Sequence, residues 1–223
     1  MNFIEIKNIK KKYTGSHEEV FALNGVNVTI DDGEFVSIMG QSGSGKSTLL
    51  SVLGGLNHPS GGNVLIDEMD IYSLSNEQIA AYRSEYLGFV FQDFNLIPYL
   101  NVIENVMLPL AIQKGSKAEK SDKALRVLAK VGLEKKIERL PNQLSGGEQE
   151  RVAIARAIVN DPPIILADEP TGNLDTGTSN EIMAVFDTLN KHGHTIIMVT
   201  HNPENATHAS RKIVILDGKI KEN

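Results

Sequence analysis

The residues Gly40-Gln41-Ser42-Gly43-Ser44-Gly45-Lys46-Ser47 fit the pattern G-x-x-x-x-G-K-[ST], in which a glycine-rich loop surrounds phosphate groups. The apolar run Phe35–Met39 before this loop indicates a buried strand, and residues 48–56 after it indicate a helix. Glycines let successive backbone N–H groups point at phosphate oxygens, and the helix adds the positive end of its dipole. We therefore expect a nucleotide here, with Lys46 at the β- and γ-phosphates and Ser47 also at Mg²⁺. The residues expected to bind the nucleotide are Gly40, Gln41, Ser42, Gly43, Ser44, Gly45, Lys46, Ser47 and Thr48.

A pair of acidic residues lies further along the chain, where the apolar segment 164–167 ends in Asp168 and Glu169. In nucleotide hydrolases with a phosphate loop, an acid at the end of such a strand holds Mg²⁺, directly or through water. Asp168 is the expected metal residue. Glu169 points elsewhere and is expected to take a proton from the water that attacks the γ-phosphorus.

Strand and helix patterns alternate along the chain. Apolar residues predict strands at 3–6, 26–30, 35–39, 64–66, 87–91, 164–167, 195–199 and 212–216. Capping-box spacings that begin at Ser116 and Ser145 predict helices over about 117–131 and from Ser145 to just before Pro162, and a further helix is expected around 182–189. This order implies right-handed crossovers and an α/β fold with a mainly parallel sheet. We expect one domain over residues 1–223, with a catalytic core at 1–92 and 161–223 and a helical subdomain at about 93–160.

The composition narrows the possible classes of protein. The 223 residues are 41% hydrophobic and 22% charged, which is typical of a globular protein, and they include no cysteine, which excludes disulfides, thiolate zinc sites and cysteine nucleophiles. The net charge of −6 disfavours nucleic acid as a partner. No stretch resembles a membrane span or a signal peptide. We therefore expect a soluble, cytosolic protein that reaches a membrane only through a partner.

One segment departs from this charge balance. Residues 114–139 contain nine Lys or Arg and four Asp or Glu, a local balance of +5 against −11 for the remainder. A solvated helix face with mixed charges accounts for such a segment. A surface held near anionic lipid headgroups is the alternative.

Two further features are not explained by a phosphate loop alone: the helix start Leu144-Ser145-Gly146-Gly147-Glu148 and the isolated His201. A small-molecule kinase, which shares the phosphate loop, predicts no such helix start. With these features, the chain resembles the ATPase subunit of ABC transporters over essentially its whole length. The motifs that carry the resemblance are, in order, the loop at 40–47, Gln92, the run at 144–148, the pair Asp168-Glu169, the run Gly172-Asn173-Leu174-Asp175, and His201.

The resemblance implies the ABC ATPase fold, which is a P-loop NTPase core with an N-terminal antiparallel β part and an inserted helical subdomain. It also implies ATP and Mg²⁺ as cofactors. Glu169 is then the general base, Lys46 stabilises phosphate charge, His201 hydrogen-bonds the γ-phosphate, and Gln92 binds Mg²⁺ or the attacking water. Tyr13 corresponds to the aromatic residue that stacks on adenine. The family buries two ATP molecules between head-to-tail copies, and the residues expected at the ATP of the other copy are Ser145, Gly146, Gly147 and Glu148, with Asp175 communicating across the dimer.

The sequence resembles most the lipoprotein-release and macrolide-efflux (LolD/MacB-type) branch of that family. The resembling residues are Gly54-Gly55-Leu56, Gly88-Phe89-Val90-Phe91-Gln92, Phe94-Asn95-Leu96-Ile97-Pro98, Glu104-Asn105-Val106 and Pro170-Thr171-Gly172-Asn173-Leu174-Asp175. Partners in that branch are integral membrane permeases with an extracytoplasmic domain, and a periplasmic or extracellular adaptor is compatible with it. The resemblance implies a homodimer formed on ATP binding, held by the permease at the cytoplasmic face of the membrane.

Two alternatives remain within the family. An ATPase of a cell-division complex, which drives a similar permease to regulate cell-wall hydrolysis, shares most of these motifs. DNA-repair and translation members are disfavoured, because they carry inserted coiled coils, zinc modules or a second fused domain. For a transporter, part of the apolar stretch 91–100, with Leu96 and Tyr99 as expected contacts, is predicted to line a groove for a cytoplasmic helix of the permease.

Overall fold

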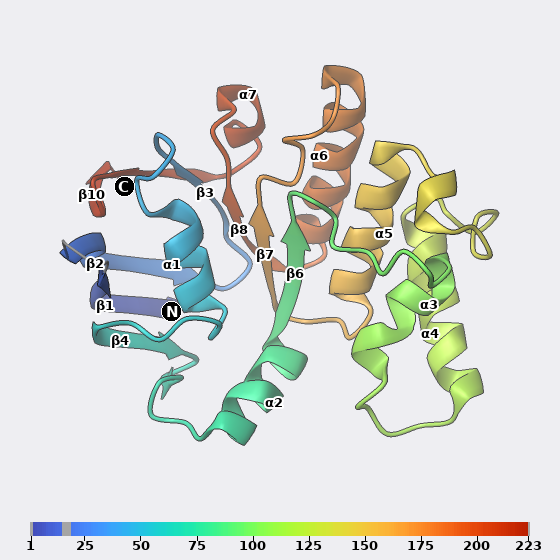
Figure 1. The fold of residues 1–223 in the computed structure, drawn as a ribbon, viewed down its shortest axis with the longest axis horizontal. Helices are drawn as coiled ribbons and strands as arrows, with labels where there is room; N and C mark the ends of the chain where they lie inside the picture. The colour runs from blue at the N-terminus through green and yellow to red at the C-terminus, as the bar shows by residue number, and fades with distance from the viewer. Residues whose placement is uncertain (1, 15–18, 223) are drawn as a thin grey trace.

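The protein forms two β-sheets with helices between and beside them (Figure 1), and the computed structural model describes residues 2–14 and 19–222. The elements are, in chain order, β1 (Asn2–Thr14), β2 (Glu19–Asp31), β3 (Phe35–Met39), α1 (Lys46–Leu53), β4 (Gly61–Ile66), β5 (Met69–Asp70), α2 (Asn76–Tyr86), β6 (Leu87–Phe91), α3 (Val102–Met107), the 3₁₀ helix η1 (Leu108–Leu110), α4 (Lys117–Lys130), the 3₁₀ helix η2 (Pro141–Gln143), α5 (Gly146–Ile158), β7 (Ile164–Asp168), α6 (Thr176–Lys191), β8 (Thr195–Val199), α7 (Pro203–Ala206), β9 (Arg211–Leu216) and β10 (Lys219–Glu222).

The larger sheet has six strands in the order β10-β9-β3-β8-β7-β6, and every pairing from β9 to β6 is parallel. Strand β10 joins its edge in antiparallel orientation. The smaller sheet is antiparallel and has the order β2-β1-β4-β5. The predicted fold class, a mainly parallel α/β core with an N-terminal antiparallel part, is confirmed.

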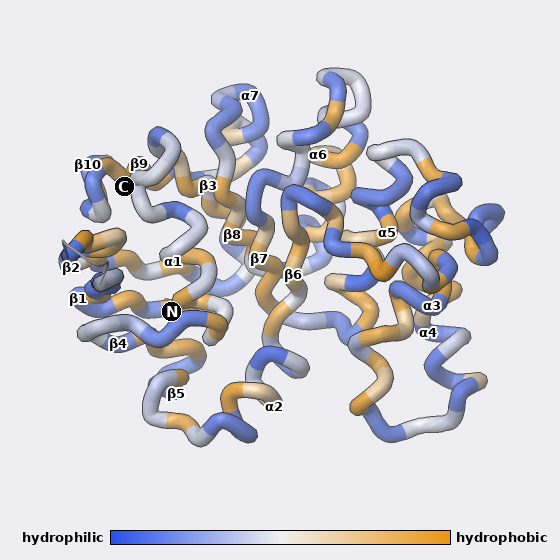
Figure 2. Tube along the Cα trace, viewed as in Figure 1, coloured by the Kyte–Doolittle hydropathy of each residue, from blue (hydrophilic) through white to orange (hydrophobic). Residues whose placement is uncertain are grey.

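Helix α1 lies between the two sheets. A hydrophobic cluster joins Leu49 of α1 with Ile4 of β1 on one side and Ile38 of β3 on the other. The opposite face of the six-stranded sheet packs on a second cluster, which contains residues of α3, α4, α5 and α6. Figure 2 shows hydrophobic residues along the central strands and hydrophilic ones in the outer loops. Strands covered on both faces are apolar on both faces, and β3 follows this pattern except at the buried Ser37.

Several predicted elements differ from those observed. The helix expected at 48–56 begins two residues earlier and ends at Leu53, because Gly54 is its C-cap. Both capping boxes are confirmed, with Ser116 before α4 and Ser145 before α5. The sequence patterns missed α2, α3, α7, β5 and β10. The elements from α3 to α5 all lie between β6 and β7, and the division into a core and a helical subdomain stays a prediction.

Helix α5 buries a carboxyl group, Glu150, which has no exposed surface and no hydrogen-bond partner among the described residues. Burial raises the pKa of Glu150 to about 9, while the charge of Arg156 acts in the opposite direction. The folded protein therefore holds a proton at neutral pH that the unfolded chain, with an ordinary glutamate pKa of 4.5, releases.

Replacing Glu150 with glutamine is expected to stabilise the protein, and to do so more strongly as the pH rises. Because the raised pKa belongs to the folded state, the wild type loses about 1.4 kcal/mol of unfolding free energy per pH unit between roughly pH 5 and pH 9. The amide removes this loss, so its advantage over the wild type should grow by roughly 3 kcal/mol between about pH 6 and about pH 8. Urea unfolding at about pH 6 and about pH 8 measures both proteins. Identical pH dependences would contradict the prediction.

Candidate active site

A cleft of about 590 Å³ opens where four parallel strands end. The residues that follow β3 form the phosphate loop, Gln92 follows β6, Glu169 follows β7 and His201 lies just after β8. Because the carboxyl ends of parallel strands meet at one edge of a sheet, residues distant in sequence line a single cleft there. The lining residues are Ala22, Gly40, Gln41, Ser42, Gly43, Gly45, Lys46, Ser47, Thr48, Gln92, Asp168, Glu169 and His201. The structure thus brings together all the residues predicted for the loop except Ser44, and the predicted catalytic and metal residues.

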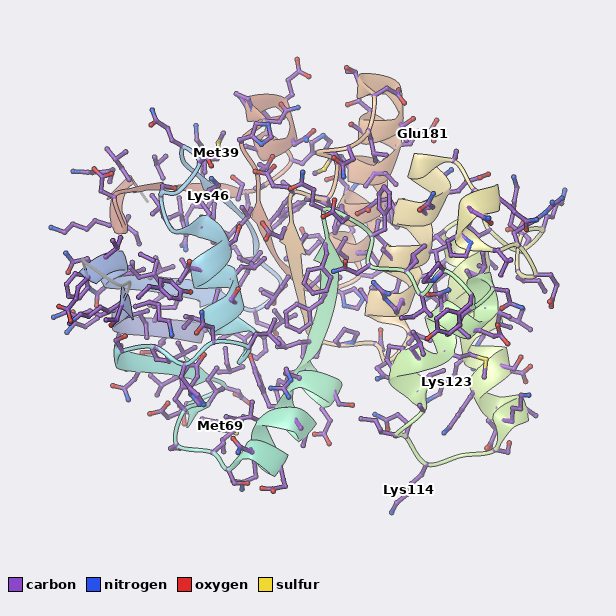
Figure 3. The ribbon with its side chains drawn as sticks, in the orientation of Figure 1. Met39, Lys46, Met69, Lys114, Lys123 and Glu181 are labelled. Atoms are coloured by element: carbon purple, nitrogen blue, oxygen red, sulfur yellow. The ribbon has the colours of Figure 1, made fainter. Side chains whose placement is uncertain are left out.

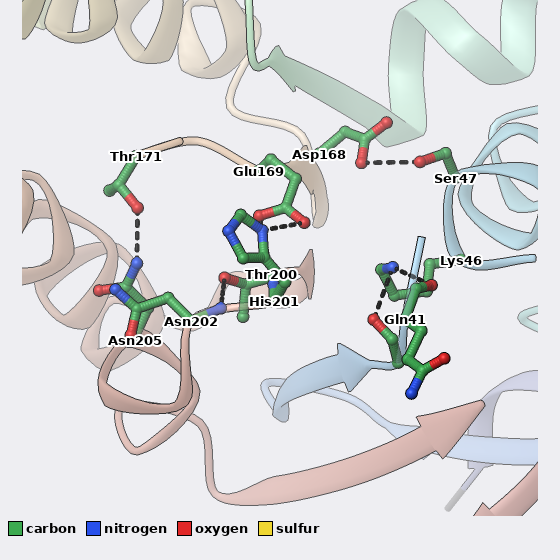
Figure 4. A network of polar contacts seen from close by, with 11 residues as sticks. Gln41, Lys46, Ser47, Asp168, Glu169, Thr171, Thr200, His201, Asn202 and Asn205 are labelled. Atoms are coloured by element: carbon green, nitrogen blue, oxygen red, sulfur yellow. Dashed lines mark hydrogen bonds and ion pairs between the residues drawn. The ribbon is translucent and has the colours of Figure 1, made fainter. Parts of the chain in front are cut away.

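Lys46 begins α1, and its side chain turns back into the phosphate loop (Figure 4). Its Nζ donates to the carbonyl oxygens of Gly40 at 2.8 Å and Gln41 at 3.0 Å, and the residue is only 8% exposed. The ammonium group has three donors, so one remains for a ligand. Gly45 has φ +106°, and a Cβ there would collide with the carbonyl oxygen of Ala22, so only glycine fits.

Ser47 and Asp168 meet across the cleft from α1 and β7 (Figure 4). The Ser47 Oγ donates to Asp168 Oδ1 at 3.1 Å. Burial raises the pKa of the Asp168 carboxyl, the nearby Glu169 also raises it, and the Ser47 hydrogen bond and Lys46 lower it. A hydroxyl and a carboxylate at this separation are oxygen ligands of the kind that Mg²⁺ prefers. The residues present therefore fit the predicted ion, with Gln92 in the lining of the same cleft.

Glu169 and His201 form a pair that sequence reasoning did not foresee. The His201 Nδ1 lies 2.9 Å from Glu169 Oε1, and the His201 backbone N–H donates to Glu169 Oε2 at 3.3 Å. The pairing arises because β7 and β8 are adjacent, with Asp168 opposite Val199. Glu169 itself has φ +49°, so the backbone turns sharply after the strand and separates its carboxylate from that of Asp168.

A second set of polar residues supports this pair. The Asn205 Nδ2 on α7 donates to Thr171 Oγ1 at 2.6 Å, which ties the loop after Glu169 to the loop after His201 (Figure 4). The Asn202 backbone N–H donates to Thr200 Oγ1 at 3.1 Å. Sequence reasoning missed Thr200, Asn202 and Asn205, and it noted Thr171 only as part of the run 170–175, without a role.

The predicted residues at 145–148 and Asp175 are not in this cleft. Ser145 begins α5 with a complete capping box, and its Oγ accepts from the Glu148 backbone N–H at 3.3 Å. The Glu148 carboxylate accepts from the Ser145 backbone N–H at 2.9 Å and pairs with Lys136 at 2.8 Å, which lowers its pKa. The Ser145 hydroxyl also interacts with the Glu148 carboxylate. The first N–H groups of α5, which have no partner within the helix, can meet an anion.

Asp175 caps α6. Its carboxylate accepts from the Thr178 backbone N–H at 3.0 Å and from the Thr178 hydroxyl at 2.6 Å, and these bonds lower its pKa. Gly147 packs against the same threonine, where a Cβ would collide with the Thr178 methyl group. The start of α5 and the start of α6 are therefore in direct contact.

Tyr13 also lies outside the lining of the cleft. Its ring is 46% exposed, its hydroxyl accepts from Asn57 Nδ2 at 2.6 Å, and Lys11 Nζ lies 5.2 Å from the ring centroid. The predicted stacking of Tyr13 on adenine remains a prediction.

A phosphate loop, a strand-ending acid pair and a histidine that meet at the carboxyl edge of a parallel sheet define a phosphate-loop ATPase. A model of the ABC transporter family matches residues 23–172, and the chain therefore belongs to that family. It is an ABC-type ATPase, the ATP-binding subunit of an ABC transporter, as the resemblance implied.

Similar proteins and solved structures support the same family assignment. The chain is 48% identical to the uncharacterized ABC transporter ATP-binding protein YknY of Bacillus subtilis, over 97% of this chain and 94% of YknY. It is 49% identical to the macrolide export ATP-binding/permease protein MacB of Chlorobium phaeobacteroides, over 97% of this chain but only 33% of MacB. A dimeric structure of MJ0796, a bacterial ABC transporter cassette, matches with a TM-score of 0.91 and 46% identity, over 98% of this chain and 97% of that one. MJ0796 has also been solved in a post-hydrolysis state bound to ADP and Pi.

Proposed function

We propose that two copies of this chain close on two ATP molecules and drive a separate membrane permease, in export or extracytoplasmic force transmission of the macrolide, peptide or lipoprotein type. The similarity to the ATP-binding part of MacB and to the MJ0796 dimer supports this proposal. The helices within residues 2–14 and 19–222 are too short or too polar to cross a membrane. The site of action is then the cytoplasmic face of the membrane, reached through the permease.

The observation that carries the proposal is that two consecutive residues line two different cavities. Gln92 lines the nucleotide cleft, whereas Phe91 lines a groove of about 550 Å³. Arg156 also lines this groove, and its guanidinium donates to the carbonyl oxygens of Phe94 and Asn95, just after Gln92. A segment seated in the groove would therefore contact Phe91, whose neighbour in the chain, Gln92, lines the nucleotide cleft. The groove residues are Leu56, Ala80, Arg83, Ser84, Leu87, Gly88, Phe89, Phe91, Asn95, Pro109, Ile112, Arg156, Ala157 and Asn160.

In the proposed hydrolysis, the loop amides and the free donor of Lys46 hold the β- and γ-phosphates. Mg²⁺, held by Ser47, Asp168 and Gln92, would supply charge neutralisation at the phosphate oxygens. Glu169 accepts the proton of the attacking water. His201 contacts Glu169 through Nδ1, and its Nε2 would hydrogen-bond the γ-phosphate.

The second copy completes the site. Ser145 and the N–H groups that begin α5 do not line the cleft of their own chain. A helix start of this kind can bind an anion, which would then have to come from another copy. In a head-to-tail pair Ser145 and these N–H groups would contact the γ-phosphate of the ATP bound by the other copy. Asp175 lies against this helix start through Thr178 and would pass its movement across the dimer.

The groove takes only part of the stretch expected to contact the permease. Of residues 91–100, Phe91 and Asn95 line it, whereas Leu96 packs against the core and Tyr99 is exposed outside it, so the expected contacts at Leu96 and Tyr99 remain predictions. Leu56 and Ile112 are the exposed apolar residues of the groove, at 54% and 77% exposure.

Replacing Leu56 with glutamate is expected to reduce permease co-purification and transport about tenfold or more, because an unpaired carboxylate would be buried in an apolar interface. ATP hydrolysis by the isolated chain should be unchanged. The matched control is Tyr99→Glu, which makes the same charge change at a residue that is 78% exposed and outside the groove. If Tyr99→Glu lost the permease while Leu56→Glu kept it, the proposed docking site would be wrong.

A further inference from the structure

The basic segment 114–139 is concentrated on one part of the surface. Lys114, Lys120, Lys123 and Arg126 line a single hollow of about 320 Å³ at the start of α4. In Figure 3, Lys114 extends from the loop before α4 away from the body of the molecule, and Lys123 lies on α4 above it. The other residues of the hollow are Leu110, Gln113, Gly115, Glu119 and Asp122.

The cationic groups of this hollow are not neutralised by ion pairs. Among the described residues, the only basic side chain of segment 114–139 in an ion pair is Lys136, with Glu148. Lys120 Nζ donates to the Ala111 carbonyl oxygen at 3.3 Å, which leaves its charge in place. The Glu119 carboxylate accepts from the backbone N–H and the hydroxyl of Ser116 at 2.7 and 2.9 Å, and it also attracts Lys123. With four basic and two acidic residues, the hollow keeps a net charge of +2.

Helix α4 presents this charge to solvent instead of burying it. Its inner face is anchored in the core by Ala124, Val127 and Leu128, which are buried in the cluster of the helical side. Its apolar face is therefore not available for insertion into a bilayer. Contact with any partner would be electrostatic and would leave α4 in its place.

The hollow adjoins the permease groove. Pro109 and Ile112 line the groove, whereas Leu110 and Lys114, on the same short segment, line the hollow. The Gln113 Nε2 also donates to the Ser84 hydroxyl of the groove at 3.3 Å. In Figure 1, α2 and the loop before α4 lie along the same lower edge of the molecule. A permease seated in the groove would thus bring the membrane surface closest to the basic hollow.

We propose that this hollow binds the anionic phospholipid headgroups of the leaflet that surrounds the permease. The proposal rests on the proposed function for the position of the membrane, and on charge for the choice of partner. Outside residues 114–139 the chain has a net charge of −11, so an anionic membrane repels most of the surface and attracts this part. A lysine ammonium group is a point charge on a flexible side chain, so separated lysines can each bind a phosphate headgroup. An acidic protein segment would need its carboxylates at matching positions.

Vesicle co-sedimentation of the full chain tests the proposal without a permease. Vesicles of equal parts phosphatidylcholine and phosphatidylglycerol are expected to bind the protein at low salt, and vesicles of phosphatidylcholine alone are not. Replacing Lys114, Lys120 and Lys123 together with glutamine should weaken binding roughly fivefold per lysine, or roughly a hundredfold in all. High salt should abolish binding, because the Debye length shortens.

A matched triple variant separates local from overall charge. Lys10→Gln, Lys212→Gln and Lys219→Gln remove the same charge from exposed positions on β1, β9 and β10, and should change binding little. Equal loss in both triple variants would overturn the proposal, and so would failure of the wild type to bind anionic vesicles. Suppose that the wild type did not bind anionic vesicles and that the variant of Lys114, Lys120 and Lys123 no longer co-purified with the permease. The hollow would then bind an acidic protein segment instead. Both triple variants should hydrolyse ATP normally. Because the vesicles contain no permease, this result is independent of the Leu56→Glu experiment on the proposed function.

Discussion

Replacing Glu169 with glutamine is expected to leave ATP binding intact and to slow ATP turnover by roughly 10²–10⁴-fold, the usual contribution of a general base. The glutamine keeps one acceptor oxygen, which can replace Oε1 at the 2.9 Å contact with His201 Nδ1, and of the two contacts with His201 it loses only the longer 3.3 Å bond from the His201 backbone N–H to Oε2. What is lost is the ability to take a proton from water. Since hydrolysis reopens the proposed dimer, the variant should also accumulate as closed pairs that retain ATP.

Single-turnover ATP hydrolysis and size-exclusion chromatography with ATP measure the two effects. Glu204→Gln is the matched control, because Glu204 lies on α7 outside the lining of the cleft. That variant should hydrolyse ATP at the wild-type rate. Full turnover by Glu169→Gln would show that the base is elsewhere.

Mixing two inactive variants is expected to restore activity if each site is built from two copies. Lys46→Ala removes the phosphate-binding ammonium, and Ser145→Asp places a carboxylate where the γ-phosphate of the other copy would lie. Aspartate is as good an N-cap as serine, so α5 should still begin at the same residue. Each variant alone should lose roughly 10²–10³-fold in turnover.

A mixed pair has one complete site, formed by the loop of the Ser145→Asp copy and the helix start of the Lys46→Ala copy. With random pairing, activity should recover to about a quarter of the wild-type value. Ser145→Asn, a neutral N-cap, is the control for the charge and should lose much less activity than Ser145→Asp. If the mixture hydrolysed ATP no faster than the separate variants, the two-copy site would be wrong.

The parts of this protein that sequence predicts well are those set by local chemistry. The phosphate loop, the capping boxes at Ser116 and Ser145 and the apolar strand Ile164–Asp168 each depend on residues a few positions apart. Helices α2 and α3 carry the same kind of box, at Ser75 with Gln78 and at Asn101 with Glu104, yet they were missed. Each buries only two or three side chains, so the apolar periodicity is weak.

The remainder depends on which strands become neighbours. The bond between Glu169 and His201 joins residues 32 positions apart and exists because β7 pairs with β8. The groove proposed for the permease could not be predicted from sequence because its lining comes from separate segments of α2, β6, α5 and the loop after η1. Local pattern cannot reveal which side chain of a loop packs inward, as Leu96 does, and which faces solvent, as Tyr99 does.

Helix α1 holds the phosphate loop while packed against a sheet on either side. An element fixed on two faces is poorly placed to move, so nucleotide-driven displacement should occur mainly in the helices from α3 to α5 relative to it. Hydrogen exchange in α1 should then be slow with or without nucleotide, which makes this helix a stationary reference for distance measurements. Since the chain has no cysteine, a single introduced thiol would carry the reporter without competition from native thiols.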